Sequence, residues 1–253
     1  MMKLSILGAG PAVPNPGGAC SGYLLQRDSS TLLIDCGHGV TSILQTVVGL
    51  SDISAIIISH MHPDHFFDLI PLKYGYLFQG FSGVPLFLPP EGKGVLQRLQ
   101  SAIGLNKRFF EESFTLHEYD AGRPLDDIPG LIVRFAPTQH FVAGYALRVA
   151  ETDDLDRQFF YSSDTGWVDT VLDLARGASL ALLEATLVEP EDIDEPPGHL
   201  TAAEAGKLAR TAGVEQLVLT HYPSDLADDI RREAAITFGG EVHLAEERQI
   251  YTV

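Results

Sequence analysis

Short apolar runs alternate with amphipathic stretches along most of the chain, and each pattern predicts a different element. Apolar runs of about four to eight residues between Gly, Pro and Ser turns are typical of strands, whereas apolar residues spaced three or four apart predict helices. The predicted strands cover residues 3–7, 22–26, 31–35, 55–59, 85–88, 114–118, 131–136, 145–149, 158–162, 180–184, 216–220 and 241–244. The predicted helices cover residues 39–48, 66–78, 92–103, 168–176, 201–212 and 225–235.

This order of elements predicts an α/β fold. We expect an αββα sandwich, in which two mixed β-sheets pack face to face and are flanked by helices, with one half of the chain in each sheet. The 253 residues, of which 45% are hydrophobic, fit one large domain over residues 1–253. Polar residues at the strand ends would then gather in the crevice between the halves.

The net charge and the lengths of the apolar runs indicate which kinds of partner the chain can have. The formal charge is −17, so the overall field repels long nucleic acids and favours a small or weakly charged substrate. The chain has no apolar run of about 18 residues or more, and its amino-terminal apolar stretch is too short for a signal peptide. We therefore expect a cytoplasmic protein with no membrane partner.

One short segment carries four metal-ligand residue types. His60, His62, Asp64 and His65 directly follow the predicted strand 55–59, which would deliver them to one point. A solvated polar loop or a purely structural metal site would also fit these residues. Structural zinc usually prefers Cys-rich sites, and this chain has only two cysteines, so a structural site is the weaker interpretation.

Three further candidate ligands follow other predicted strands. His140 comes after strand 131–136, Asp164 after strand 158–162 and His221 after strand 216–220. Any one of them alone would be read as a loop histidine or a helix-capping aspartate. Their shared position beyond a strand favours a common site instead.

Together these seven residues resemble the signature of the metallo-β-lactamase superfamily, His-x-His-x-Asp-His followed by a His, a bridging Asp and a final His. The resemblance spans nearly the whole chain. It implies one divalent metal ion held by His60, His62, His140 and Asp164, and a second held by Asp64, His65, Asp164 and His221. Such nitrogen and oxygen ligands suit zinc, with Mn²⁺ or Fe²⁺ as alternatives.

Two more motifs resemble the ribonuclease Z branch of that superfamily: Leu182-Leu183-Glu184-Ala185-Thr186 and the Gly198-His199-Leu200-Thr201 segment. The resemblance implies that Glu184 orients His199 and that His199 is the general acid, so the implied catalytic residues are Asp64, Glu184 and His199. Alternatively, Glu184 is an ordinary strand-end residue and His199 only precedes the cap of helix 201–212. An alkoxide leaving group needs a proton, so a dedicated acid favours phosphodiester cleavage.

The chain departs from ribonuclease Z in ways that bear on the substrate. The interval from His140 to Asp164 is filled by two strands and a turn, which leaves no room for the arm that grips transfer RNA. Residues 189–195 are strongly acidic, lead into His199 and would repel a polyanion, and the sequence leaves open whether they gate the site. We therefore expect a small phosphodiester substrate, such as a cyclic or short nucleotide, cleaved by a hydroxide that bridges the two metals.

Other functions remain open. A thioester or lactone hydrolase of the glyoxalase II type would use the same seven ligands, and a transfer RNA 3′-processing endonuclease lacking the usual arm would use the same acid pair. A non-catalytic scaffold is disfavoured because every ligand position is filled. The related nucleases suggest a homodimer.

Four aromatic residues lie on or just after the predicted helix 66–78: Tyr74, Tyr76, Phe78 and Phe81. They could line a pocket or a dimer face. Helical aromatic residues usually face inward, so we expect them to pack in the core.

Overall fold

The computed structural model describes residues 1–28, 30–190 and 198–253 of the chain. Its first sheet has the strand order β13-β1-β2-β3-β4-β5-β6 and its second the order β12-β11-β10-β9-β8-β7. The first sheet consists of β1 (Lys3–Gly8), β2 (Gly22–Arg27), β3 (Ser30–Ile34), β4 (Ala55–Ile57), β5 (Val84–Leu88), β6 (Phe114–Glu118) and β13 (Ile250–Thr252). The second consists of β7 (Leu131–Pro137), β8 (Tyr145–Glu151), β9 (Gln158–Tyr161), β10 (Leu180–Glu184), β11 (Gln216–Thr220) and β12 (Val242–Leu244).

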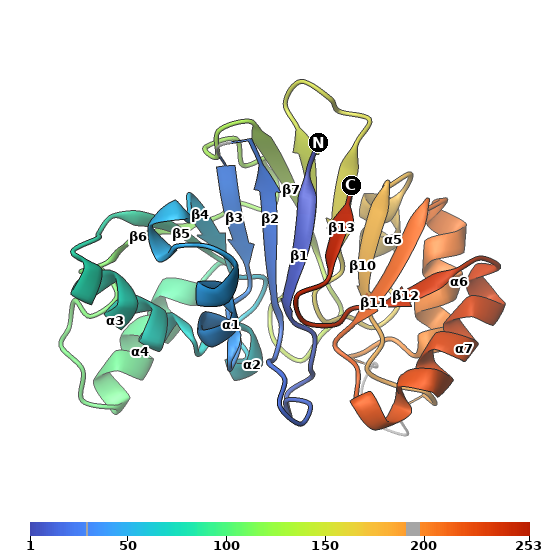
Figure 1. Cartoon of the computed structure of the whole chain (residues 1–253), viewed down its shortest axis with the longest axis horizontal. Helices are drawn as coiled ribbons and strands as arrows, with labels where there is room; N and C mark the ends of the chain where they lie inside the picture. Colours follow the sequence, from blue (N-terminus) through green and yellow to red (C-terminus); the bar gives the residue numbers. More distant parts are fainter. Residues whose placement is uncertain (29, 191–197) are drawn as a thin grey trace.

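The helices form the two outer layers (Figure 1). The first sheet is covered by α1 (Val40–Val47), α2 (Pro63–Phe66), α3 (Leu69–Gln79) and α4 (Gly92–Ala102), and the second by α5 (Asp169–Ala175), α6 (Ala202–Ala212) and α7 (Ala227–Phe238). Short 3₁₀ helices cover Leu50–Asp52 and Ser224–Leu226. The predicted αββα sandwich of two mixed sheets is confirmed. Among the described helices, none combines the length and the apolar composition that crossing a bilayer requires.

The central strands are apolar throughout because both of their faces are covered. In β10, Leu180 and Leu182 point into the core between the sheets, whereas Ala181 and Leu183 pack against the outer helices. Successive strand residues face opposite sides of a sheet, so a strand buried on both sides reads as a continuous apolar run. This packing also fixes the carboxyl ends of these strands at one edge of the sandwich.

The predicted helix 66–78 is wrong at its start. The chain forms α2 up to Phe66 and begins α3 only at Leu69. Between them, Asp68 turns toward α1 and its carboxylate accepts a hydrogen bond of 2.9 Å from the backbone N–H of Thr41. Pro71 then falls in the first turn of α3, where the missing N–H would have no intrahelical partner, so it is tolerated.

The expectation of one chain half per sheet is wrong for the last strand. β13 lies antiparallel to β1 in the first sheet, with Lys3 opposite Thr252, so both termini lie side by side in Figure 1. No strand was predicted here because β13 has only three residues, none of them buried. It covers the edge of β1, which would otherwise present unpaired backbone groups.

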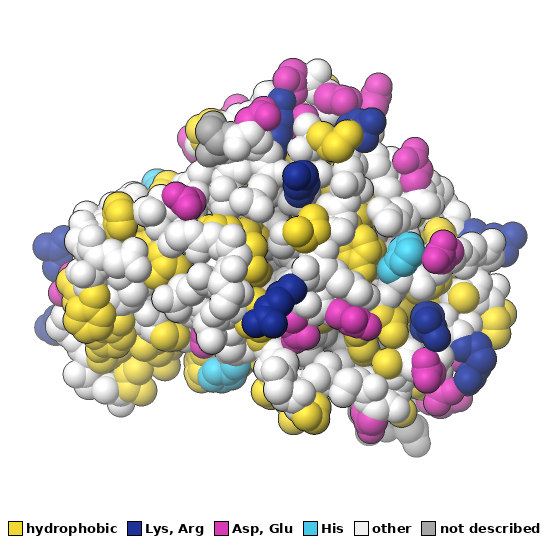
Figure 2. All heavy atoms as spheres, in the orientation of Figure 1, with side chains coloured by type: hydrophobic (Ala, Val, Ile, Leu, Met, Phe, Trp, Pro, Cys, Tyr) yellow, Lys and Arg dark blue, Asp and Glu magenta, His cyan; other side chains and the backbone are white. Residues whose placement is uncertain are grey.

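The four aromatic residues near α3 do not share one environment. Tyr76 is fully buried, but Tyr74, Phe78 and Phe81 are 38%, 82% and 42% exposed, so core packing is wrong for these three. The buried apolar residues of α3, Leu69, Leu72 and Tyr76, lie on the face toward the sheet. The other face is open, and Figure 2 shows hydrophobic side chains gathered over this end of the molecule.

Candidate metal and acid–base site

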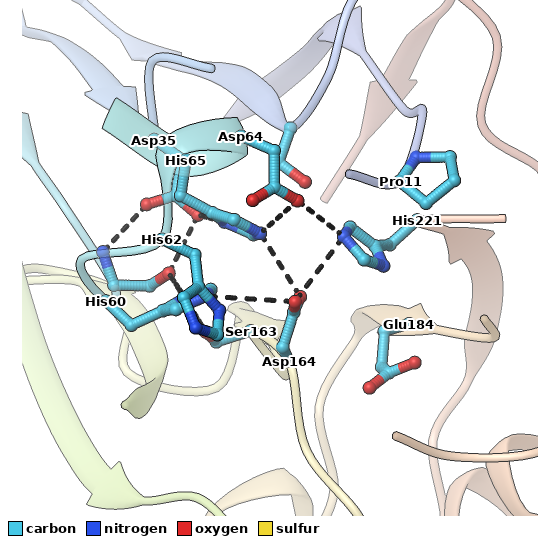
Figure 3. Close-up of polar contacts among 12 residues, drawn as sticks. Pro11, Asp35, His60, His62, Asp64, His65, Ser163, Asp164, Glu184 and His221 are labelled. Atoms are coloured by element: carbon cyan, nitrogen blue, oxygen red, sulfur yellow. Dashed lines mark hydrogen bonds and ion pairs between the residues drawn. The ribbon is translucent and has the colours of Figure 1, made fainter. Parts of the chain in front are cut away.

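The site lies where neighbouring parallel strands end. β9, β10 and β11 run parallel, with Leu182 opposite Tyr161 and Glu184 opposite Thr220, so the residues that follow these strands emerge at the same edge. β3 and β4 run parallel in the facing sheet. All seven predicted ligands are brought together at this edge: His60, His62, Asp64, His65, His140, Asp164 and His221. Figure 3 labels each of them except His140.

One group consists of three imidazoles. His62 Nδ1 lies 3.2 Å from His60 Nε2 and 2.9 Å from His140 Nε2. Nitrogens that bind one zinc ion at about 2.0–2.1 Å in a tetrahedron are about 3.3 Å apart, so this spacing fits a metal. Burial is the main cause that lowers the pKa of all three rings, which keeps them neutral, as metal ligands must be.

The second group consists of Asp64, His65, Asp164 and His221, all buried. Their side chains point toward one another in Figure 3, with His221 Nε2 at 3.2 Å from Asp64 Oδ2 and 3.4 Å from Asp164 Oδ2. Within the described parts of the chain, His65 Nε2 and Asp164 Oδ1 are buried atoms without a hydrogen-bond partner. A cation between these atoms would satisfy both, so the residues fit a second metal.

Asp164 lies between the two groups. Its Oδ2 is 3.8 Å from both His60 Nε2 and His140 Nε2, and its Oδ1 is 3.3 Å from His65 Nε2. The alternative role as a helix cap is not realised, because α5 begins after Val168 and has no side-chain cap. This placement is the one that a bridging carboxylate requires.

The charges of the site favour a cation. Burial raises the pKa of Asp64, but the hydrogen bond from His221 and the charge of His65 outweigh it and bring the pKa to about 2. Burial lowers the pKa of His65, yet the carboxylates of Asp164 and Asp35 outweigh it and hold the pKa well above its ordinary value. Without a metal, a proton on His65 therefore supplies the positive charge that these carboxylates attract.

Apart from His62, each candidate histidine ligand also makes a contact through its Nδ1 atom. The residues that make these contacts were not predicted as part of the site. The contacts are His65 Nδ1 to Asp35 Oδ2 at 2.8 Å, His60 Nδ1 to Ser163 Oγ at 3.3 Å, His140 Nδ1 to the Gly198 carbonyl at 2.7 Å, and His221 Nδ1 to Thr186 Oγ1 at 2.8 Å. Such outer contacts fix the tautomer and orientation of metal ligands.

Two of these supporting residues and one candidate ligand have a strained backbone. Asp35, Ser163 and His221 have φ of 56°, 54° and 54°, in the left-handed region that non-glycine residues rarely adopt. Asp35 is held in place because its carboxylate also accepts hydrogen bonds from Ser59 and Tyr161. Strain of this kind, about 1–3 kcal/mol per residue, is typical of functional sites. In the sequence, Asp35 is the polar residue that ends the predicted apolar strand 31–35.

Glu184 and His199, the two residues of the implied acid pair, are in contact. Glu184 is fully buried, and its Oε1 lies 3.0 Å from His199 Nδ1. The carboxylate also accepts hydrogen bonds from the backbone N–H groups of Thr165 and Thr186 and from the Thr186 hydroxyl. A ring nitrogen of His199 lies within 4.8 Å of ligand atoms of His140 and Asp164, and the side chain keeps 15% of its surface exposed.

Two neighbouring segments bear on the substrate. The interval from His140 to Asp164 holds β8, the short connection 152–157 and β9, as predicted. The predicted acidic segment 189–195 falls mostly outside the described residues, which include Glu189 and exclude 191–197. The chain enters α6 after His199 through a capping box of Thr201 and Glu204.

Comparisons with known proteins agree with this architecture. The family model described as Beta-lactamase superfamily domain matches residues 30–222. The probable metallo-hydrolase YhfI of Bacillus subtilis is 30% identical over 250 residues, which cover 97% of each chain. Its crystal structure matches with a TM-score of 0.86 over 99% of this chain and 98% of that one, at 28% identity. Ribonuclease Z of Mycobacterium bovis is 27% identical over 274 residues, covering 98% of this chain and 96% of its own. This chain therefore belongs to the β-lactamase superfamily, as a metal-dependent hydrolase with the metallo-β-lactamase fold.

Proposed function

We propose that this protein hydrolyses a small phosphodiester, such as a cyclic or short nucleotide. The observation that carries the proposal is the buried Glu184, which holds His199 beside the candidate ligands. A thioester or lactone expels a leaving group that needs little protonation, whereas an alkoxide leaving a phosphodiester needs a proton. A positioned acid therefore favours the phosphodiester.

The candidate ligands would hold two divalent metal ions, of which Zn²⁺ is expected. When bound, such ions supply positive charge for the phosphoryl oxygens and lower the pKa of water toward about 7. Asp164 would bridge the two positions, since its carboxylate faces both groups. Asp64 would orient the attacking water by accepting one of its hydrogen bonds.

His199 would complete the reaction. With Nδ1 bonded to Glu184, the ring would carry its transferable proton on Nε2. As the bond from phosphorus to the leaving oxygen breaks, this proton would move from Nε2 to that oxygen. Glu184, anchored by two backbone N–H groups, would stabilise the positively charged imidazolium before the transfer.

Two observations support a small diester over a long nucleic acid. The net charge of −17 opposes the approach of a polyanion. The short connection between β8 and β9 offers no arm for transfer RNA. The similarity to ribonuclease Z, an enzyme named for cutting RNA, supports the phosphodiester itself.

The test compares rates on an alkyl phosphodiester, a nitrophenyl phosphodiester, a thioester and a lactone, for the wild type and His199→Ala. General acid catalysis contributes about 100- to 10,000-fold, so His199→Ala should lose about this factor on the alkyl diester and much less on the nitrophenyl diester. Elemental analysis should find about two metal ions per chain in both proteins, as in other dinuclear hydrolases.

The matched control is His243→Ala, a histidine on β12 outside the candidate site. It should leave all four rates unchanged. A wild type that turns over the thioester or lactone but neither diester would reject the proposal. Equal losses on both diesters would reject the acid role of His199.

A further inference from the structure

An exposed aromatic ring stands at the rim of the site. Phe141 directly follows His140, and 51% of its surface is exposed. Its ring centroid lies 5.2 Å from that of His140 and 6.2 Å from that of His199. No step of the proposed reaction uses this ring. It is therefore an apolar surface next to the candidate metal ligands and the candidate acid.

The loop that carries Phe141 is fixed rather than free. Residues 138–144 connect β7 to β8, and both of their ends are hydrogen-bonded, within the loop or to other segments. The bonds are Thr138 N–H to Gly144 O at 2.9 Å, Gln139 N–H to Thr165 Oγ1 at 3.1 Å, His140 Nδ1 to Gly198 O at 2.7 Å, and Tyr145 N–H to Ser59 O at 3.2 Å. Because the loop is already held in place, a ligand that contacts the ring would lose little binding free energy in ordering it.

Gly198 determines where the ring lies. A Cβ atom at this position would come within 2.4 Å of Cε2 and 2.6 Å of Cζ of Phe141. Only a glycine lets the ring rest on the backbone immediately before His199. The edge of the ring is therefore held against the segment that carries the acid, while half of its surface stays open.

We propose that Phe141 forms the wall of a substrate subsite that takes a flat aromatic group on the ester arm next to His199. This rests on the proposed function, because the ester arm is that of the phosphodiester. A nucleobase or a phenyl ring would stack on the exposed face of Phe141 while the phosphate lies at the candidate ligands. Stacking of a base on an aromatic side chain contributes about 5- to 150-fold in affinity.

Binding measurements test this subsite without turnover. Calorimetry would compare three phosphate monoesters on the metal-loaded protein: phenyl, cyclohexyl and methyl phosphate. They carry the same anionic group, and only the first adds a flat aromatic ring. We expect phenyl phosphate to bind the wild type about 5- to 150-fold more tightly than methyl phosphate, and more tightly than cyclohexyl phosphate.

Three variants complete the test. Phe141→Ala should abolish the preference for phenyl phosphate and leave methyl phosphate binding unchanged. Phe141→Trp should retain the preference. Gly198→Ala should weaken it, because the new methyl group displaces a ring that is still present.

Three results would overturn the subsite: no preference in the wild type, a loss in Phe141→Ala that is equal for all three ligands, or equal binding of phenyl and cyclohexyl phosphate. The last result would mean that the surface selects for apolar area and not for a flat ring. Diester turnover by the wild type tests the proposed function separately, since none of these binding ratios depends on it.

Discussion

Replacing Thr186 by Val removes the side-chain hydroxyl but keeps the branched shape of the side chain. The change should therefore show what the hydroxyl contacts contribute. Thr186 Oγ1 lies 2.8 Å from His221 Nδ1 and donates to Glu184 Oε2 at 2.7 Å. His221 directs its Nε2 toward Asp64 and Asp164. With a metal held at Nε2, the ring would carry its hydrogen on Nδ1, where Thr186 Oγ1 can accept it. One hydroxyl thus connects a candidate metal ligand to the partner of the candidate acid.

The magnitude follows from what each partner loses. In Thr186→Val the His221 N–H would lose its acceptor in a largely buried position, which costs about 1–3 kcal/mol. Glu184 would keep its bonds from two backbone N–H groups and from His199. Loss of an outer contact typically costs about 10- to 100-fold in metal affinity, which is about 1.4–2.7 kcal/mol and agrees with the first figure.

The assay is a competition titration of the metal-loaded protein with a chelator, together with kcat on the alkyl diester. Thr186→Val should release one metal ion at about 10- to 100-fold lower chelator concentration, and Thr186→Ser, which restores the hydroxyl, should remain close to the wild type. Thr170→Val is the control, since that hydroxyl bonds to Pro137 O on the surface. Wild-type metal affinity in Thr186→Val, or an equal loss of metal affinity in Thr186→Ser, would show that the Thr186 hydroxyl does not support His221.

Two further predictions concern protonation and packing. Metal loading at pH 7.5 should release about one proton from His65, because nearby carboxylates outweigh the effect of burial and hold the pKa of His65 well above its ordinary value. Calorimetry in two buffers of different ionisation enthalpy measures the number of protons released, and a release of zero would contradict the prediction. For the same reason, the stability that charged His65 gives the metal-free protein should be fully present below about pH 6.5 and disappear as the pH rises through the raised pKa. In Gly206→Ala the new Cβ would lie 2.3 Å from Ala234 O on α7, and this overpacking should lower Tm by about 2–12 °C. Gly94→Ala meets only the end of the Arg98 side chain at 3.3 Å and should not lower Tm; equal effects of the two changes would show that packing is not the cause.

The sequence predicted the strands of the core well and the peripheral elements less well. β10 and β11 have the predicted bounds, because strands covered on both faces leave an apolar run in the sequence. β13 leaves no such run, since its residues are exposed or half-buried. The break before α3 depends on Asp68 binding to α1, a contact that no local pattern records.

The sequence by itself determined the αββα fold and the residues that gather at its edge. His60, His140, Asp164 and His221 each follow an apolar strand, and strands that are packed in parallel must end together. Only the tertiary structure decided what holds these side chains: Asp35, Ser163, Thr186 and the Gly198 carbonyl, which lie 30, 103, 35 and 58 residues from the histidines they contact. A hydrogen bond across such a separation depends on the three-dimensional packing of whole elements, so it leaves no periodic pattern in the chain.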